Sequence, residues 1–164
     1  MIMDTRIRQK ITPFLWFDNN AEEAVNFYAS VFRDSAIGTV TRFSPEGAQA
    51  SGMPEGSVMT IAFSLEGQEF VAINGGPHFR FTEAVSFVVS CETQADIDHY
   101  WTHLSEGGAP AAQQCGWLKD RYGLSWQVVP AMLPELMRDP ARAARVMKAV
   151  LPMKKINLAA LVNA

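Results

Sequence analysis

The stretch CGWLKDRYGLSWQVVP, residues 115–130, decides the fold of this chain. Two apolar runs of strand length flank an Asp-Arg-Tyr-Gly segment, and this pattern is typical of two antiparallel strands joined by a tight turn. Gln127 lies in the middle of the second run, where a sheet that lines a cavity could equally have carried a carboxylate. Because divalent metal ions need imidazole or carboxylate donors, the residue type at this position bears on whether the protein can be a metalloenzyme.

Upstream of this hairpin, the pattern alternates between strands and single helices. ITPFLWFD (11–18) predicts a strand, and AEEAVNFYASVF (21–32) predicts an amphipathic helix with Asn20 as its N-cap. Later in the chain, 84–92 predicts another strand and 93–108 a capped helix. Between these two pairs we predict strands at 37–43, 57–65 and 69–74, a Gly/Pro/Ser-rich loop at 44–57 and a hairpin turn at 66–68.

The two predicted helices match one another at an offset of 73 residues, which also aligns Phe14 with Phe87. At this offset the aromatic pair Phe27-Tyr28 falls on Tyr100-Trp101, and the apolar positions that would face a core coincide. We therefore predict an α+β fold of tandem βαβββ modules in a single domain. Module one spans about 9–76, module two about 82–130, and a helical tail follows at 131–164.

The tail is predicted to form a helix that starts at Pro140 after the N-cap Asp139, and a second short helix within INLAALVNA (156–164). An apolar stripe of Val146, Met147 and Val150 is expected to pack on the domain or on a second subunit. The tail also carries a cluster of basic residues, which indicates either a solvated helix face or a docking surface for an acidic partner or anionic ligand. These residues are Arg138, Arg142, Arg145, Lys148, Lys154 and Lys155.

Composition excludes several classes of function. Hydrophobic residues make up 48% of the chain and charged residues 19%, which is ordinary for a globular protein. A net charge of -3 gives no electrostatic footprint for nucleic acid. No apolar run is long enough to span a membrane or to form a signal peptide, so we expect no membrane partner and a cytoplasmic location. Cys91 and Cys115 form no CxxC pair and are expected to be reduced thiols.

Two such modules would each leave one sheet face uncovered, and together these faces would line a cup that suits a small organic ligand. Trp16 and Trp117 lie on predicted strands, where they could present aromatic surface to the ligand or belong to the core. Asn74 and Gln127 could hydrogen-bond the ligand, or they could be buried amides that pair with neighbouring groups.

Other residues could carry chemistry. His78 in the loop NGGPHFRF could act as a general base or ligand contact, or it could be a surface histidine. Cys115 precedes basic residues that would favour a reactive thiolate, although a buried, inert cysteine is the commoner case. His99 and His103 are four residues apart on a predicted helix and could form a metal pair, but a solvated helix face is favoured because no Glu follows His99 as in zinc proteases.

Three segments, together with the paired modules, resemble a known family. KITPFLWFDNNAEEAVNFYASVF, LEGQEFVAINGGPHFRFTEAVSFVVSCET and CGWLKDRYGLSWQVVP are similar to the PhnB-like, or demethylubiquinone methyltransferase-like, branch of the vicinal oxygen chelate superfamily. That superfamily also includes glyoxalases, extradiol dioxygenases and bleomycin-resistance proteins. The resemblance covers residues 9–160 and implies a homodimer. Nothing in the chain resembles the glycine-rich loop with which a doubly wound fold would bind S-adenosylmethionine.

The metal enzymes of this superfamily bind one divalent ion with His or Glu side chains from the first and last strands of each module. In this chain the corresponding stretches are 11–16, 71–74, 84–86 and Gln127, and none of them contains His, Asp or Glu. We therefore expect a protein that binds a small organic molecule without a catalytic metal or other cofactor. A metal-dependent lyase or dioxygenase of the glyoxalase type is one alternative, and a methyltransferase, as the family label suggests, is another.

Overall fold

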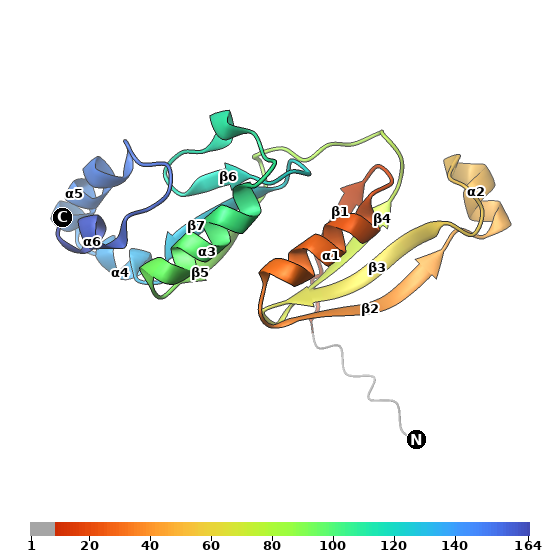
Figure 1. The fold of residues 1–164 in the computed structure, drawn as a ribbon, viewed down its shortest axis with the longest axis horizontal. Coiled ribbons are helices and arrows are strands. Elements are labelled where there is room, and N and C mark those ends of the chain that lie inside the picture. The colour runs from red at the N-terminus through yellow and green to blue at the C-terminus, as the bar shows by residue number, and fades with distance from the viewer. Residues whose placement is uncertain (1–8) are drawn as a thin grey trace, which may run out of the picture. The chain divides into compact units, whose positions relative to one another are not determined.

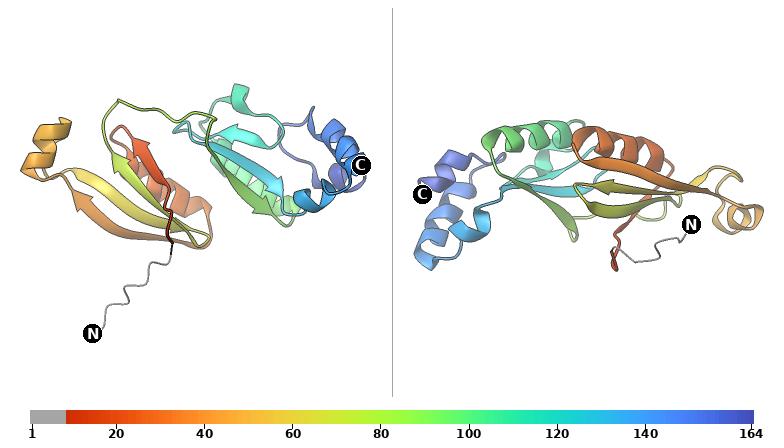
Figure 2. Two further views of the ribbon diagram at one scale, coloured as in Figure 1. Left: turned by 180° about the vertical axis from the view of Figure 1, so that it is seen from behind. Right: turned by 90° about the horizontal axis from the view of Figure 1, so that it is seen from below.

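The structure is a computed structural model that describes residues 9–164. These residues fall into two compact units, which divide between Arg80 and Phe81. Each unit consists of a sheet with one long helix packed along one of its faces (Figures 1 and 2). None of the helices in the described part of the chain is long and apolar enough to cross a membrane.

The first unit contains a mixed sheet in which β1 pairs in parallel with β4, and β3 pairs antiparallel with β4 and β2. The sheet order is therefore β1-β4-β3-β2. Helix α1 buries Tyr28 against this sheet, where the ring stacks on Phe63 at a centroid distance of 6.4 Å. The elements are β1 (Phe14–Phe17), α1 (Ala21–Val31), β2 (Ser35–Arg42), α2 (Pro45–Ser51), β3 (Val58–Leu65) and β4 (Gln68–Asn74).

Two connections in this unit, the turn at Glu66-Gly67 and the segment 44–57, test the predictions made from turn residues. The predicted hairpin turn is confirmed, because Leu65 pairs with Gln68 across a two-residue loop in which Glu66 and Gly67 both have positive φ angles, 48° and 81°. The predicted loop at 44–57 is wrong in part, since it contains helix α2. The Ser44 hydroxyl accepts a bond from the Gly47 N–H at 3.1 Å, so a Ser-Pro start that reads as loop also serves as a helix N-cap.

The second unit has a smaller sheet and more helix. In its described residues the sheet has three strands in the order β5-β7-β6, with β5 parallel to β7 and β6 antiparallel to β7. The elements are β5 (Ser86–Cys91), α3 (Gln94–Ser105), the 3₁₀ turn η1 (Pro110–Ala112), β6 (Trp117–Lys119), β7 (Ser125–Pro130), α4 (Leu133–Leu136), α5 (Pro140–Val150) and α6 (Leu158–Val162).

The predicted α+β fold with two successive modules is confirmed, but the second module is shorter than the first. Between its helix and its final hairpin, it has η1 where the first module has strand β2. The segment Ala109-Pro110 explains the difference, because proline lacks the N–H that a strand interior needs for its ladder.

The repeat is in phase along the helices but not along the first strands. Ile97, Trp101 and Leu104 are buried on α3, and these positions match buried residues of α1 at the predicted offset. Phe14, however, is 58% exposed, while Phe87 contacts the buried Trp126 at a ring-centroid distance of 5.7 Å. The alignment of Phe14 with Phe87 is therefore wrong, because the strand-to-helix connection is one residue shorter in module two and a one-residue slip exchanges the faces of a strand.

The tail forms the predicted helices. Asp139 caps α5 by accepting a bond from the Arg142 N–H at 2.8 Å, and Asn157 caps α6 in the same way through the N–H of Ala160. Val146 and Val150 are buried as expected. Met147 is 42% exposed, so it is not buried on the domain, and its packing on a second subunit stays a prediction.

Candidate functional site

The second sheet has one face under α3 and one face that no helix of this unit covers. Trp126 and Val128 on β7 are buried toward α3. Because side chains alternate along a strand, Ser125 and Gln127 project from the opposite face. The register extends this face to the neighbouring strands, where Trp117 on β6 lies directly across from Gln127. We call this surface the open face of the second sheet.

Gln127 is fixed by a partner on the neighbouring strand. Its Nε2 donates a hydrogen bond to the hydroxyl of Ser86 at 2.9 Å. The side-chain carbonyl of Gln127 can still accept a bond, and the indole of Trp117 lies beside it at the next strand. An amide that is held in one orientation next to an aromatic ring can bind a flat polar molecule by a hydrogen bond and by ring stacking.

Ser125 lies next to Gln127 on the same face and is only 1% exposed. In the part of the chain that the structure describes, its hydroxyl has no hydrogen-bond partner. Its cross-strand neighbours are Ser86 on β5 and Lys119 on β6. An unpaired hydroxyl in such a place costs about 1–3 kcal/mol of folding free energy, so its lack of a partner needs an explanation.

Lys119 adds charge to this face. Its Nζ lies 2.6 Å from the Oε1 of Glu83, and this hydrogen bond holds the pKa of the Glu83 carboxyl below its ordinary value. Sequence reasoning missed Ser125, Lys119 and Glu83 as site residues. Alternation from Gln127 would have found Ser125, but the partners on β5 and β6 depend on strand register, which the sequence alone does not give.

Cys115 precedes β6 in a strained turn, with a positive φ of 53°. Its backbone N–H donates to Met153 O at 2.8 Å, and its thiol lies 3.6 Å from Leu151 O. The residue therefore anchors the tail segment to the start of β6. Of the predicted candidates, only Trp117 and Gln127 lie together on the open face of the second sheet.

Trp16 and His78 belong to the first unit, where the NGGPHF segment wraps around the indole. The Trp16 Nε1 donates to Gly76 O at 2.9 Å, and Phe79 packs edge-on against the indole at a centroid distance of 4.8 Å. A Cβ atom at Gly75 would lie 2.1 Å from the Trp16 ring, so only glycine permits this contact. His78 lies exposed on the same loop.

Asn74 has its polar atoms engaged in the structure. It is 5% exposed, its Oδ1 accepts a bond from the Ala21 N–H at 2.8 Å, and its Nδ2 donates to Val58 O at 3.2 Å. Asn20 occupies the predicted N-cap position, but its side chain makes no capping bond. Asn74 supplies the bond instead, from the end of β4, and its side chain points toward α1.

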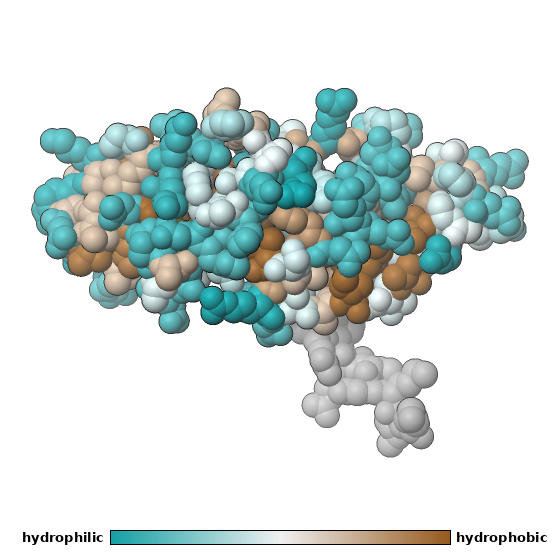
Figure 3. Space-filling model, in the orientation of Figure 1, coloured by the Kyte–Doolittle hydropathy of each residue, from teal (hydrophilic) through white to brown (hydrophobic). Residues whose placement is uncertain are grey.

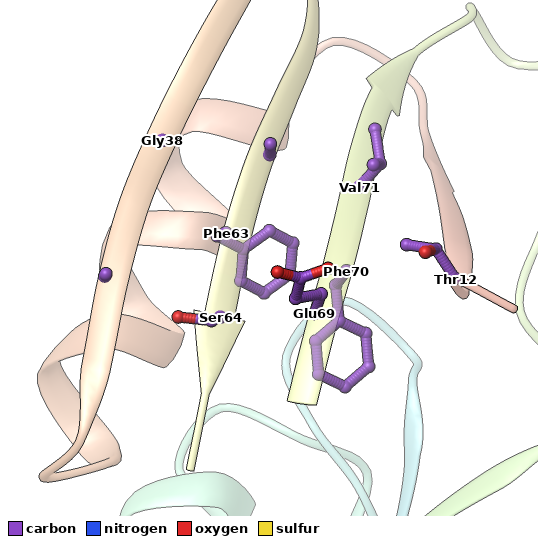
Figure 4. A pocket seen from close by; sticks show the side chains of 9 residues that line it. Thr12, Gly38, Phe63, Ser64, Glu69, Phe70 and Val71 are labelled. Carbon is purple, nitrogen blue, oxygen red and sulfur yellow. The ribbon is translucent and has the colours of Figure 1, made fainter. Parts of the chain in front are cut away.

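A concave surface lies on the first unit, on the side of its sheet away from α1. It encloses about 320 Å³, and Figure 4 shows Glu69 and Val71 of β4 beside Ser64 of β3 at its floor. None of the six predicted ligand residues lines it. The lining residues are Thr12, Ala36, Gly38, Ala62, Phe63, Ser64, Glu69, Phe70 and Val71.

Within residues 9–164, no three His, Cys, Asp or Glu side chains lie close enough to hold a metal ion together. Glu69 and Glu83 lie just outside the stretches 71–74 and 84–86, which correspond to the metal-binding strands of the superfamily's enzymes. Both are near the side of a sheet that no helix of their own unit covers. Neither belongs to a group of three such donors within the described residues, and a divalent ion needs several such ligands at once.

Comparison with known proteins identifies the family of this chain. The family model described as 3-demethylubiquinone-9 3-methyltransferase matches residues 9–129. Among solved structures, a PhnB protein from Bacillus cereus is 41% identical, with 75% of this chain and 100% of that chain covered and a TM-score of 0.65. A Pseudomonas aeruginosa protein of 22% identity shares the fold, with a TM-score of 0.57 over 73% of this chain and 96% of that chain. No curated protein matches.

Proposed function

This chain belongs to the PhnB-like family described as 3-demethylubiquinone-9 3-methyltransferase, and from that premise we propose that it binds a small organic molecule without a catalytic metal. We place the binding site on the open face of the second sheet. We also assign the chain to the vicinal oxygen chelate superfamily, with whose glyoxalase-like architecture its two modules agree.

The observation that carries the proposal is the buried, unpaired hydroxyl of Ser125. Because this hydroxyl is almost fully buried, a hydroxyl or carbonyl group on a ligand would satisfy it only when a neighbouring side chain on this face, such as Lys119, moves aside, and the free energy that folding loses at this position would then be recovered on binding. Gln127 can accept a second hydrogen bond two residues further along the strand, and Trp117 offers a ring to stack on. These groups suit a flat ring with hydroxyl or carbonyl substituents.

Charge on this face favours an uncharged or anionic ligand over a cation. The Lys119 ammonium would repel a divalent ion, and the nearby carboxylate of Glu83 is engaged in an ion pair with it. The remaining donors, Ser86, Ser125 and Gln127, are neutral and coordinate divalent ions poorly. This arrangement supports ligand binding over the metal-dependent lyase or dioxygenase alternative.

Methyl transfer receives less physical support. An S-adenosylmethionine site of the doubly wound type needs a glycine-rich turn between a first strand and its helix. In this chain, α1 begins after Asp18-Asn19-Asn20 and α3 after Glu92-Thr93, and neither connection contains glycine. Calorimetry with S-adenosylmethionine tests this alternative, and saturable binding would favour it over our proposal.

The main test measures binding of two matched probes, 4-hydroxybenzamide and 4-hydroxybenzoate, by saturation-transfer NMR and calorimetry. We expect Ser125→Ala to weaken binding at least about tenfold, since one buried hydrogen bond of about 1.4 kcal/mol is lost. The same variant should be as stable as wild type or more so, because it removes an unpaired buried hydroxyl. Ser30→Ala, at an exposed position of α1 in the first unit, is the matched control.

Two results would overturn the proposal. One is unchanged binding in Ser125→Ala and Gln127→Ala while Ser30→Ala behaves as wild type, and the other is the absence of binding of both probes to the wild-type chain. Metal analysis of the untagged, purified protein tests whether the site is free of a metal ion. A stoichiometric divalent ion that is lost in Gln127→Ala would contradict a metal-free site on this face.

We also propose that the protein is a homodimer, with the outer side of the tail helices as an interface. Met147 is 42% exposed and Leu151 is 55% exposed, and the two residues are one helical turn apart at the end of α5. Light scattering coupled to size exclusion should give a dimer for wild type and a monomer for Met147→Glu/Leu151→Glu. A monomeric wild-type protein would contradict this proposal.

A further inference from the structure

Helix α3 carries two histidines one turn apart, His99 and His103. Their ring centroids are 4.6 Å apart with an angle of 61° between the ring planes, so the two imidazoles are already in contact. The helix that holds them starts with a capping box, in which Thr93 and Asp96 bond each other's backbone N–H groups. The first turn is therefore anchored, and the two rings project from a regular helical backbone.

The pair lies on the outer side of the helix. Ile97, Trp101 and Leu104 are buried against the second sheet, whereas His103 is exposed and His99 is partly exposed. The surface over α3 is largely hydrophilic (Figure 3). The pair is also separated from Gln127 by the whole thickness of the unit, since α3 covers the face of the sheet that Gln127 does not occupy.

Two imidazoles at positions i and i+4 of a helix can direct one nitrogen each at a single ion. Imidazole is a preferred ligand for Cu²⁺, Ni²⁺ and Zn²⁺. We propose that His99 and His103 form a surface site for a borderline divalent transition-metal ion, with water in the remaining coordination positions. This site goes beyond the proposed ligand site and does not depend on it.

The surrounding charges define the ligand set. Asp96 is engaged in the capping box, and Glu106 lies 3.7 Å from Arg121 in an ion pair. Neither carboxylate joins the histidines in a group of three donors within the described chain. With two protein ligands only, the site should follow the usual order of affinity for nitrogen donors, with Cu²⁺ bound more tightly than Ni²⁺ or Zn²⁺.

The chain offers its own control, since it has three histidines and the third, His78, lies on a loop of the first unit. Untagged, full-length protein is titrated with CuCl₂, and binding is followed by calorimetry and electron paramagnetic resonance. We expect one site per chain with two nitrogen ligands in the spectrum. His103→Gln should weaken binding at least about tenfold, because even the loss of an outer-shell partner of a metal ligand costs about 10–100-fold.

His78→Gln should bind Cu²⁺ as wild type does. Circular dichroism verifies that α3 remains folded in the variants, and His99→Gln provides an independent second removal. Equal affinity in wild type, His99→Gln and His103→Gln, or a loss confined to His78→Gln, would overturn the proposal. A spectrum with a single nitrogen ligand would overturn it as well.

Discussion

The helices of the two units begin in different ways, although both follow the first strand of a module. Helix α3 is capped by residues next to it in sequence, because Thr93 and Asp96 form a capping box. Helix α1 has no such local cap, and Asn74 reaches its first N–H from the end of β4, 53 residues away. The start of α3 is thus encoded locally, whereas the start of α1 depends on a sheet that has already formed.

The turns of the final hairpins also differ between the two units, and here it is the second unit that depends on a buried side chain. The β3–β4 turn of the first unit needs only two residues with positive φ angles. The β6–β7 turn of the second unit is built around the buried carboxylate of Asp120, which is 2% exposed. Its Oδ1 accepts bonds from the Tyr122 and Leu124 N–H groups at 2.8 and 3.1 Å, and its Oδ2 accepts from Trp126 Nε1 at 2.9 Å. The backbone defines one turn, and a side chain defines the other.

The largest predicted effect follows from removing that carboxylate. Asp120→Ala leaves the N–H groups of Tyr122, Leu124 and the Trp126 indole without their acceptor. We expect the free energy of unfolding to fall by about 3 kcal/mol or more, since each buried donor left unpaired costs about 1–3 kcal/mol. Urea unfolding measures the change. Glu66→Ala, in the exposed β3–β4 turn, is the control, and an equal loss in both variants would contradict the distinction between the two turns.

The next effect concerns the remote cap. Asn74→Ala removes an acceptor from the Ala21 N–H and a donor from Val58 O, both at buried positions. We expect a loss of about 2 kcal/mol, more than an exposed cap contributes, because the backbone groups left behind are shielded from water. Asn20→Ala is the matched control, since Asn20 makes no side-chain capping bond and its loss should change stability little. A larger loss in Asn20→Ala than in Asn74→Ala would contradict the assignment.

The local cap should matter less. Thr93→Ala removes the hydroxyl that accepts from the Asp96 N–H at 3.1 Å at an exposed helix end. Water can replace this bond, so we expect a loss of about 1 kcal/mol in urea unfolding. Hydrogen exchange sharpens the comparison, because Thr93→Ala should increase exchange in the first turn of α3 alone, whereas Asn74→Ala should increase it in α1 and at the end of β4. Increased exchange across both units in Thr93→Ala would contradict a local role.

The sequence predicted those features that depend on neighbouring residues. Helix phases, the tail cap Asp139 and the Glu66-Gly67 turn all follow from local periodicity and capping chemistry. Two of the errors have causes that no single segment of the sequence reveals. The cap of α1 comes from Asn74, and the faces of Phe14 and Phe87 depend on a connection that differs by one residue, which reverses the faces of a strand without a clear mark in composition.

The residues of the candidate site also fall into those that the sequence indicates and those that only the structure reveals. Gln127 and Trp117 could be chosen from the sequence because an amide and an indole are conspicuous within apolar strands. Alternation from Gln127 indicates that Ser125 shares its face, but the burial of Ser125 and its lack of a partner are known only from the structure. Lys119 and Glu83 join the site through the ladder and an ion pair between segments 36 residues apart. Register therefore determines the site, and local sequence patterns carry little information about register.

The smallest effect concerns the two cysteines, which have contrasting environments within the second unit. Burial, with a further contribution from the negative charge of Asp96, raises the pKa of the Cys91 thiol to about 12. Cys91 is 2% exposed, whereas Cys115 lies on a partly exposed turn. Because the thiolate is the nucleophile, we expect iodoacetamide to modify Cys115 in native protein while Cys91 reacts only after unfolding, as mass spectrometry of the peptides would reveal. Equal rates of modification at both sites in native protein would contradict this difference.

The same pKa shift predicts how stability varies with pH. The unfolded chain releases the Cys91 proton near the ordinary thiol pKa of 9.0, whereas the folded protein retains it up to about pH 12. The contribution of this thiol to stability is therefore fully present below pH 9.0 and is lost as the pH rises from there toward 12. Lysines and tyrosines also titrate in this window, so the measurable quantity is the difference in urea unfolding between wild type and Cys91→Ala at each pH. That difference should shift in favour of the alanine variant as the pH rises above 9.0, and a difference independent of pH would show that the thiol is not held in its protonated form by the fold.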